Sequence, residues 1–229
     1  MEKQESMNIY DADAVQRYAL VVTENGEKFD TAHVFNPLSD KDYLSHVNSV
    51  SIEGNADNVD ANDKLITAAL WDAQIKEVEN IEVDPSDDWK SLIDIDEKVD
   101  AMNMFLTVVI VEPEIAQNGK RKLTQQKTET VITEAFFNGF PVSQTHTMQS
   151  KTLEFAKKYD KIRRKSFETE KTKGLSRKPK IRYVPQDEKY GELYDEMLVS
   201  STGFKSFTPL RFKVKVIDYI FASKIDEKK

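Results

Sequence analysis

Two segments of this chain begin with Leu, an aromatic residue and Asp: LWDAQIKEVENI at residues 70–81 and LYDEMLVSSTGF at residues 193–204. Apolar residues then recur at matching positions, Ile75 with Leu198 and Ile81 with Phe204. A pattern repeated far along the chain constrains the fold strongly, because it predicts two similar structural units. We expect each segment to be the first helix of such a unit.

The match resumes further along each segment. Ser91 aligns with Ser206, and the shift between the copies changes from 193 − 70 = 123 to 206 − 91 = 115 residues, so the first copy holds eight additional residues around DPSDDWK. The aligned apolar positions then follow a helical repeat: Ile95 with Leu210, Val99 with Val214, Met102 with Ile217 and Leu106 with Phe221. Two unrelated pairs of amphipathic helices that match by chance are the alternative to a duplication.

Upstream of each match lies a β segment that contains a histidine, TAHVF with His33 and QTHTM with His146. Asn-Gly pairs, which suit the left-handed residues of tight hairpin turns, occur at 25–26, 118–119 and 138–139. Helices are expected after Ser39, over 95–106, from Thr152 to about 167, and after Thr208, a good N-cap. The sequence therefore predicts an α+β fold of antiparallel β-hairpins with packed helices. Its duplicated units would span 15–112 and 125–223, as two units or within one compact domain.

Composition excludes several classes of protein. Hydrophobic residues make up 39% of the 229, enough for a folded core, and there is no cysteine for disulfides or thiolate chemistry. No stretch of about 18 apolar residues suggests a membrane span, and the N-terminus lacks the apolar core of a signal peptide. We expect a protein of a reducing cytoplasm.

Charge is distributed unevenly. The stretch 157–182 holds twelve Lys or Arg against three Asp or Glu, a balance of 12 − 3 = +9 in a chain whose net charge is −7. The stretch 79–100 holds nine acidic residues and two lysines. The basic stretch could bind phosphates or the acidic surface of another copy, or could be a solvated helix that leads into a flexible loop.

Recognisable catalytic or cofactor motifs are missing. There is no nucleotide-binding glycine loop, zinc-protease motif or calcium loop, and we expect no cofactor. His33, His46 and His146 are too dispersed for a metal cluster, so packing or surface roles are favoured. The carboxylates of DPSDD and DIDE form a solvated acidic loop that could hold a hard cation only loosely. An enzyme would need a convergent pocket that the sequence does not disclose.

Charged residues also repeat between the two copies. Asp72 and Asp195 follow the aromatic residues Trp71 and Tyr194, while Lys98 and Lys213 occupy the same position of each second helix. A repeated Asp–Lys contact that packs each unit is one interpretation. Coincidental exposed charge is the other.

The order of segments in the first half resembles a known group of proteins. An opening hairpin is followed by FNPLSDKDYL, by LWDAQIKEVENI and by DDWKSLIDIDEKVDAM, and this order covers about residues 18–106 with a weaker echo at 190–221. It resembles the small α+β assembly proteins encoded among the tail genes of tailed bacteriophages, including the tail assembly chaperones. This chain departs from that group by carrying two copies and a basic insertion.

The resemblance implies a non-enzymatic phage assembly or structural protein that binds other phage tail proteins, or itself, either in the host cytoplasm during assembly or also in the virion. Such binding needs exposed aromatic side chains and complementary charges. The candidate contact residues, for which core packing is the alternative role of the aromatics, are Trp71, Trp89, Tyr194, Arg163, Arg164 and Lys165. Nucleic-acid binding through the basic stretch is the alternative function.

Overall fold

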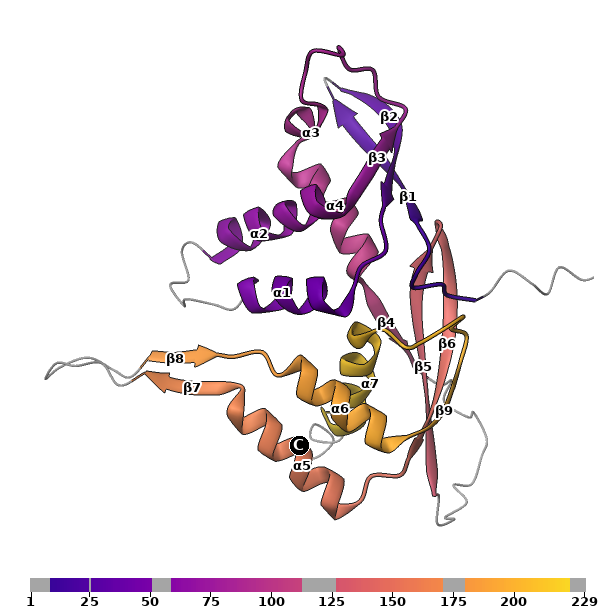
Figure 1. Cartoon of the computed structure of the whole chain (residues 1–229), viewed down its shortest axis with the longest axis vertical. Coiled ribbons are helices and arrows are strands. Elements are labelled where there is room, and N and C mark those ends of the chain that lie inside the picture. The colour runs from indigo at the N-terminus through magenta and orange to yellow at the C-terminus, as the bar shows by residue number, and fades with distance from the viewer. Residues whose placement is uncertain (1–8, 25, 51–58, 113–126, 171–179, 223–229) are drawn as a thin grey trace, which may run out of the picture.

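The computed structural model describes residues 9–24, 26–50, 59–112, 127–170 and 180–222 (Figure 1). The first half of the chain forms β1 (Gln16–Glu24), β2 (Glu27–Phe35), α1 (Asp40–Val50), α2 (Val59–Gln74), β3 (Ile75–Glu79), α3 (Trp89–Leu92), α4 (Ile95–Leu106) and β4 (Val108–Val111). The second half forms β5 (Thr128–Phe137), β6 (Phe140–Gln149), α5 (Leu153–Lys165), β7 (Phe167–Glu170), β8 (Lys180–Tyr183), α6 (Asp187–Met197), β9 (Leu198–Thr202) and α7 (Leu210–Ala222).

The two halves repeat one order of elements. A hairpin, two helices, a third strand and a last helix occur in residues 16–106, which we call unit 1, and again in residues 128–222, which we call unit 2. The sheet orders are β1-β2-β3 and β5-β6-β9, so the central strand is the second strand of the hairpin in each unit. All pairings within these sheets are antiparallel, and the α+β class is confirmed.

Each unit also has additions of its own. Unit 1 carries the short helix α3, and unit 2 carries the β7–β8 hairpin between α5 and α6. Strand β4 follows α4 directly along the chain but pairs with β5, so it extends the sheet of unit 2 to four strands. The boundaries at 15–112 and 125–223 therefore divide the second sheet between the two halves.

Turn chemistry explains the hairpins. Asn138 and Gly139 have φ values of 51° and 81° and close β5 on β6 with Phe137 opposite Phe140. Left-handed values at two successive residues are those of a tight hairpin turn, for which Asn-Gly is the preferred pair. Gly26, with φ of 85°, lies at the corresponding turn of unit 1, where Glu24 is opposite Glu27. The third pair, at 118–119, lies outside the described residues.

The helices predicted over both opening segments are wrong beyond their first five residues. Helix α2 ends at Gln74 and α6 at Met197, and the next five residues of each form an edge strand. Ile75 pairs with Phe35 and Leu198 with Met148, each beside a register shift that leaves one residue of the edge strand without an opposite residue. The apolar spacing suited a helix, but pairing with the neighbouring strand decides the conformation of such short segments.

Helix starts follow the capping residues in most cases. Ser39 Oγ accepts from the Asp42 backbone N–H at 3.1 Å, and Thr152 Oγ1 accepts from that of Phe155 at 3.2 Å. Helix α7 differs, because Leu210 donates its backbone N–H to Asp40 Oδ1 of unit 1 at 2.8 Å, whereas the predicted cap Thr208 lies beside Ser201. The first residue of α1 thus satisfies the N-terminus of α7.

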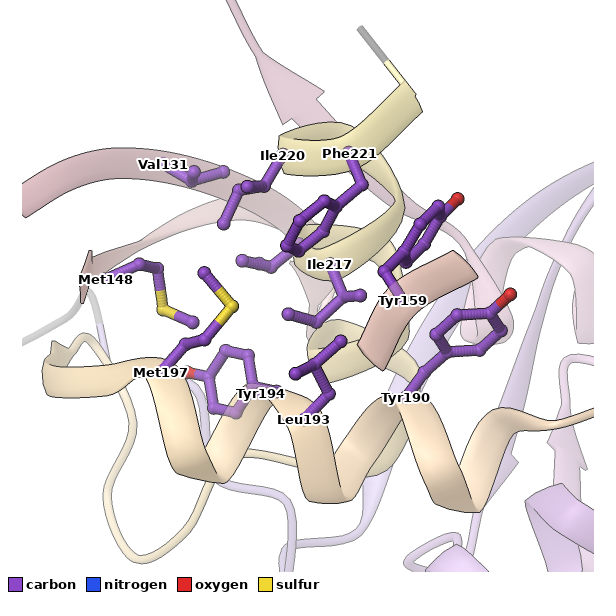
Figure 2. Packing of buried hydrophobic residues seen from close by; sticks show 11 residues of the cluster. Val131, Met148, Tyr159, Tyr190, Leu193, Tyr194, Met197, Ile217, Ile220 and Phe221 are labelled. Carbon is purple, nitrogen blue, oxygen red and sulfur yellow. The ribbon is translucent and has the colours of Figure 1, made fainter. Parts of the chain in front are cut away.

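Three apolar clusters form the core. Helices α5, α6 and α7 pack on β5 and β6 in the cluster of unit 2, where Tyr194, Met197 and Ile217 are fully buried (Figure 2). In unit 1, α2 and α4 pack Trp71 and Phe105 against the first sheet. The third cluster packs the two segments that flank unit 1, the residues before β1 and strand β4, against unit 2, and its buried members are Tyr10, Ala12, Val108, Ala135, Val142 and Phe212.

Polar contacts also join the units. Tyr18 donates its hydroxyl to the Phe136 carbonyl at 2.9 Å, and Tyr43 donates to Asp187 Oδ2 at 3.1 Å. The buried guanidinium of Arg211 donates to the Tyr10 hydroxyl and lies 5.2 Å from the centre of the Phe105 ring. The units therefore form one packed body rather than two separate domains.

Candidate functional site

A buried histidine occupies the central strand of each sheet. His33 on β2 lies opposite Val78 of β3, and His146 on β6 lies opposite Ser201 of β9. Both side chains are fully buried. Each faces the aromatic residue of the repeated segment, so the structure joins two features that lie far apart in the sequence.

In unit 1 the histidine lies between an indole and a carboxylate. Trp71 Nε1 donates to His33 Nδ1 at 3.0 Å, and His33 Nε2 lies 3.0 Å from Glu97 Oε1. Because an indole nitrogen only donates, Nδ1 must accept and the ring proton must be on Nε2, where it is donated to Glu97. We call this series of hydrogen bonds a relay, and it connects α2, β2 and α4.

In unit 2 the same tautomer follows from a longer chain of donors. Gln144 donates its amide to the Val142 carbonyl at 2.8 Å, so its Oε1 faces Thr133 and accepts the hydroxyl proton at 3.1 Å. Thr133 then accepts from His146 Nε2 at 2.9 Å, and His146 Nδ1 accepts from the Tyr194 hydroxyl at 2.7 Å. Each of these four side chains, Gln144, Thr133, His146 and Tyr194, thus has a hydrogen-bond partner inside the unit.

Burial keeps the groups of unit 2 uncharged near neutral pH. It lowers the pKa of His146 to about 4 and raises the pKa of Tyr194 to about 12. Neutral groups with satisfied hydrogen bonds fix α6 on the sheet without buried charge. The two histidines therefore orient an aromatic residue and position a helix, and their surroundings are packed rather than open.

The repeated acids and lysines meet in both units. Lys98 Nζ lies 2.9 Å from Asp72 Oδ1, and Lys213 Nζ lies 2.8 Å from Asp195 Oδ1. Each lysine also lies over the repeated aromatic ring, Lys98 at 4.8 Å from Trp71 and Lys213 at 5.8 Å from Tyr194. The Lys98 side chain is 10% exposed and that of Lys213 is 20% exposed, so these pairs cover the rings from solvent.

Two of the aromatic residues expected at a partner contact are excluded from it. Trp71 and Tyr194 are fully buried, because each ring fills the core beneath its helix. Trp89, in α3, is partly buried and packs edge-to-face on Trp71 with the ring centres 6.1 Å apart. It therefore covers the core of unit 1 and presents only part of its ring to solvent.

The basic candidates lie on the surface. Lys157, Lys161, Arg163, Arg164 and Lys165 of α5, which we call the basic surface, are all exposed. Arg163 and Arg164 line an open cavity of about 300 Å³ with Asp160 and Phe167. The side chains from 168 to 183 lie outside the part of the chain that is described, so only half of the basic stretch can be placed.

An acidic groove lies at the other end of the molecule. It has a volume of about 1100 Å³ and lies between the β1–β2 hairpin, the end of β3 and the start of α4. Four carboxylate residues line it, and so do exposed apolar side chains such as Phe29 and Leu92. The four, Glu24, Glu82, Asp94 and Glu97, and these apolar residues define what we call the acidic groove.

The face of the four-stranded sheet that points away from the helices is partly apolar. Val109, Val111, Ile132 and Phe136 are each 36–44% exposed on this outer face. Val111 of β4 lies directly opposite Ile132 of β5. Val109 lies opposite Glu134, which comes between Ile132 and Phe136 along β5. These four apolar residues thus lie on two neighbouring strands around Glu134, and we call them the outer row.

Sequence reasoning missed the residues that complete the relays. Glu97 was one of many acids in a charged helix, and Thr133 and Gln144 lay in strands without a distinctive pattern. The alternation of inward and outward residues on β5 and β6 places Thr133, Gln144 and His146 on one face, and this could have indicated a polar cluster.

Among the described residues, no three His, Cys, Asp or Glu side chains are close enough together to hold a metal ion. No helix in the described ranges has the length and apolar character that crossing a membrane requires. Comparison with protein-family models, with curated proteins and with solved structures gave no match to this chain.

Proposed function

We propose that this chain is a non-enzymatic assembly or structural protein of a tailed bacteriophage that binds another tail protein in the host cytoplasm. The proposal rests on the likeness of residues 18–106 to tail assembly proteins and on one observation of the fold. That observation is the outer row, since exposed apolar side chains that gather on one face of a sheet are characteristic of protein contacts.

The outer row suits a protein partner better than a small ligand. Its side chains lie on a sheet surface rather than in a cavity, with Glu134 among them and Thr145 of β6 opposite Ile132. Many protein interfaces mix apolar and polar surface in this way. A protein that acts only during assembly and one that is retained in the virion both fall within this proposal.

Co-expression with each tail protein encoded beside its gene tests this function. A specific complex with one of them is expected, and Ile132→Ser together with Phe136→Ser weakens it about tenfold or more. Val199→Ser with Phe207→Ser, two apolar residues exposed outside the outer row, serve as the matched control.

Mass spectrometry of assembly intermediates and particles gives the second measurement. Detection of the chain with its tail partner in either sample supports the proposal. Its absence from both, together with no complex on co-expression, contradicts it.

A further inference from the structure

We propose that the basic surface of one copy binds the acidic groove of a second copy, so that the protein associates head to tail. The two surfaces carry opposite charge and lie at opposite ends of the molecule, with α5 at one end of the long axis and α3 with the β1–β2 hairpin at the other (Figure 1). They cannot meet within one chain. This interface is separate from the outer row and extends beyond the proposed function.

Unpaired charge on α5 is the first argument. Among the described residues, Lys158 is the one α5 lysine or arginine with a salt bridge, to Glu154 and Glu196. The five members of the basic surface therefore project charge without a described partner. Exposed charges of one sign attract a surface of the other sign and orient it.

The acidic groove provides the matching shape and charge. Glu24 and Glu82 are exposed at its border and have no described salt bridge, while Asp94 caps α4 and Glu97 binds His33. Phe29 is 45% exposed and Leu92 is 59% exposed, so an inserted segment would also bury apolar area. A groove with both components binds a basic segment with apolar side chains, and Phe167 lies beside Arg163 and Arg164 at the end of α5.

The geometry of this contact has a consequence for the assembly. Because two different surfaces meet, each pair of bound copies leaves one basic surface and one acidic groove unoccupied, and further copies add until a ring closes or a filament grows. The net charge of −7 favours this protein partner over nucleic acid, since the whole molecule repels a polyanion while the groove attracts α5.

Charge reversal at either surface tests the contact. Arg163→Glu with Arg164→Glu changes the basic surface, and Glu24→Lys with Glu82→Lys changes the groove without altering the cap of α4 or the His33 relay. Each variant is expected to weaken self-association about tenfold or more in sedimentation velocity. Lys41→Glu with Lys127→Glu, two exposed lysines outside both surfaces, is the matched control and is expected to associate like the unaltered chain.

Mixing the two variants gives the sharper result. Each retains one intact surface, so an equimolar mixture is expected to recover association, because the intact groove of one variant binds the intact basic surface of the other. A chain with all four substitutions is expected to recover association through the reversed charges. Circular dichroism verifies that every variant is folded. Association weakens with salt, as for other exposed charge pairs.

Three results would overturn the proposal. One is an unaltered chain that is monomeric at all concentrations tested. Another is association that neither variant weakens. The third is a monomer that retards single-stranded DNA through Arg163 and Arg164, which assigns the basic surface to nucleic acid instead.

Discussion

Units 1 and 2 use one layout for their buried histidines but complete it with different chemistry. In both, a histidine on the central strand accepts from an aromatic donor, Trp71 or Tyr194, and donates through Nε2. In unit 1 the proton goes to the carboxylate of Glu97, and in unit 2 it goes to the neutral Thr133. The position of the histidine and the ring is therefore what both units require, while the final acceptor differs.

The corresponding turns after β3 and β9 differ in the same way. Asn80 and Gly203, 123 residues apart like the two opening segments, have φ values of 62° and 89°. The Asn80 amide donates to the Asp30 carbonyl at 3.1 Å, whereas a Cβ on residue 203 would lie 2.7 Å from the Ser143 carbonyl oxygen. A side chain thus stabilises the turn in one unit, and its absence permits close approach in the other.

The largest expected effect comes from removing the buried ring of unit 1. Trp71→Ala is expected to lower the free energy of unfolding by about 3–5 kcal/mol, because it leaves a cavity in the core. Tyr194→Ala is expected to do the same in unit 2. Denaturant unfolding measures both, with Trp89→Ala as a partly exposed control of smaller effect. A loss below about 1 kcal/mol for one of these two variants would show that the two units do not depend equally on their buried rings.

The pH dependence of unit 2 is the next largest effect. The pKa of His146 is about 4 when folded and about 6.5 when unfolded, so the unfolded chain binds the proton first. This contribution is fully present above about pH 6.5 and decreases by up to about 3 kcal/mol as the pH falls to about 4. Unfolding midpoints across this range, compared with those of His146→Gln, measure it.

Asp218 complicates that measurement with the opposite sign. Burial and the neighbouring Asp187 raise the pKa of Asp218 to about 6, so its ionisation destabilises the fold and stability rises as the pH falls through that range. An Asp218→Asn background removes this contribution. An equally steep decline with and without His146 in that background would contradict the assignment.

Substitutions in the turns after β3 and β9 are expected to change stability by different amounts. Gly203→Ala is expected to cost about 2 kcal/mol or more, because the new Cβ meets the Ser143 carbonyl in a left-handed backbone. Asn80→Gly loses one exposed hydrogen bond and is expected to cost less than about 1 kcal/mol. Thermal unfolding of the two variants gives the comparison, and equal losses would contradict it.

The smallest difference concerns the ends of the two relays. Thr133→Val leaves His146 Nε2–H and Gln144 Oε1 without their partner inside the sheet, so a loss of about 1–2 kcal/mol is expected. Glu97→Gln keeps an acceptor oxygen for His33, and a loss below about 1 kcal/mol is expected. The ranking reverses if the carboxylate charge, rather than the acceptor, stabilises unit 1.

Much of this fold could be predicted from local sequence. Asn138-Gly139 specifies its turn, Ser39 and Thr152 begin their helices, and the apolar spacing of 95–106 matches α4. What could not be predicted depends on contacts between distant segments. The strands after Gln74 and Met197 form because a neighbouring strand pairs with them, and Asp40 rather than Thr208 satisfies the start of α7.

The candidate site residues likewise differ in how far the sequence could predict them. The repeated residues Asp72, Lys98, Asp195 and Lys213 could be paired by alignment, because their helices recur in register. The burial of Trp71 and Tyr194 could not be predicted, since the same residue types form cores and interfaces. The acidic groove combines side chains from the β1–β2 hairpin, the segment after β3 and α4, so no single stretch of sequence indicates it.

Strand β4 has a consequence for any attempt to separate the two halves. It belongs to the first half by chain order and to the second by hydrogen bonding, and Val108 packs in the third cluster with Ala135 and Phe212 of unit 2. A fragment that ended after residue 112 would expose an unpaired strand edge, a surface prone to aggregation. Two fragments produced together would instead complement one another, with β4 as the covalently detached strand that restores the sheet.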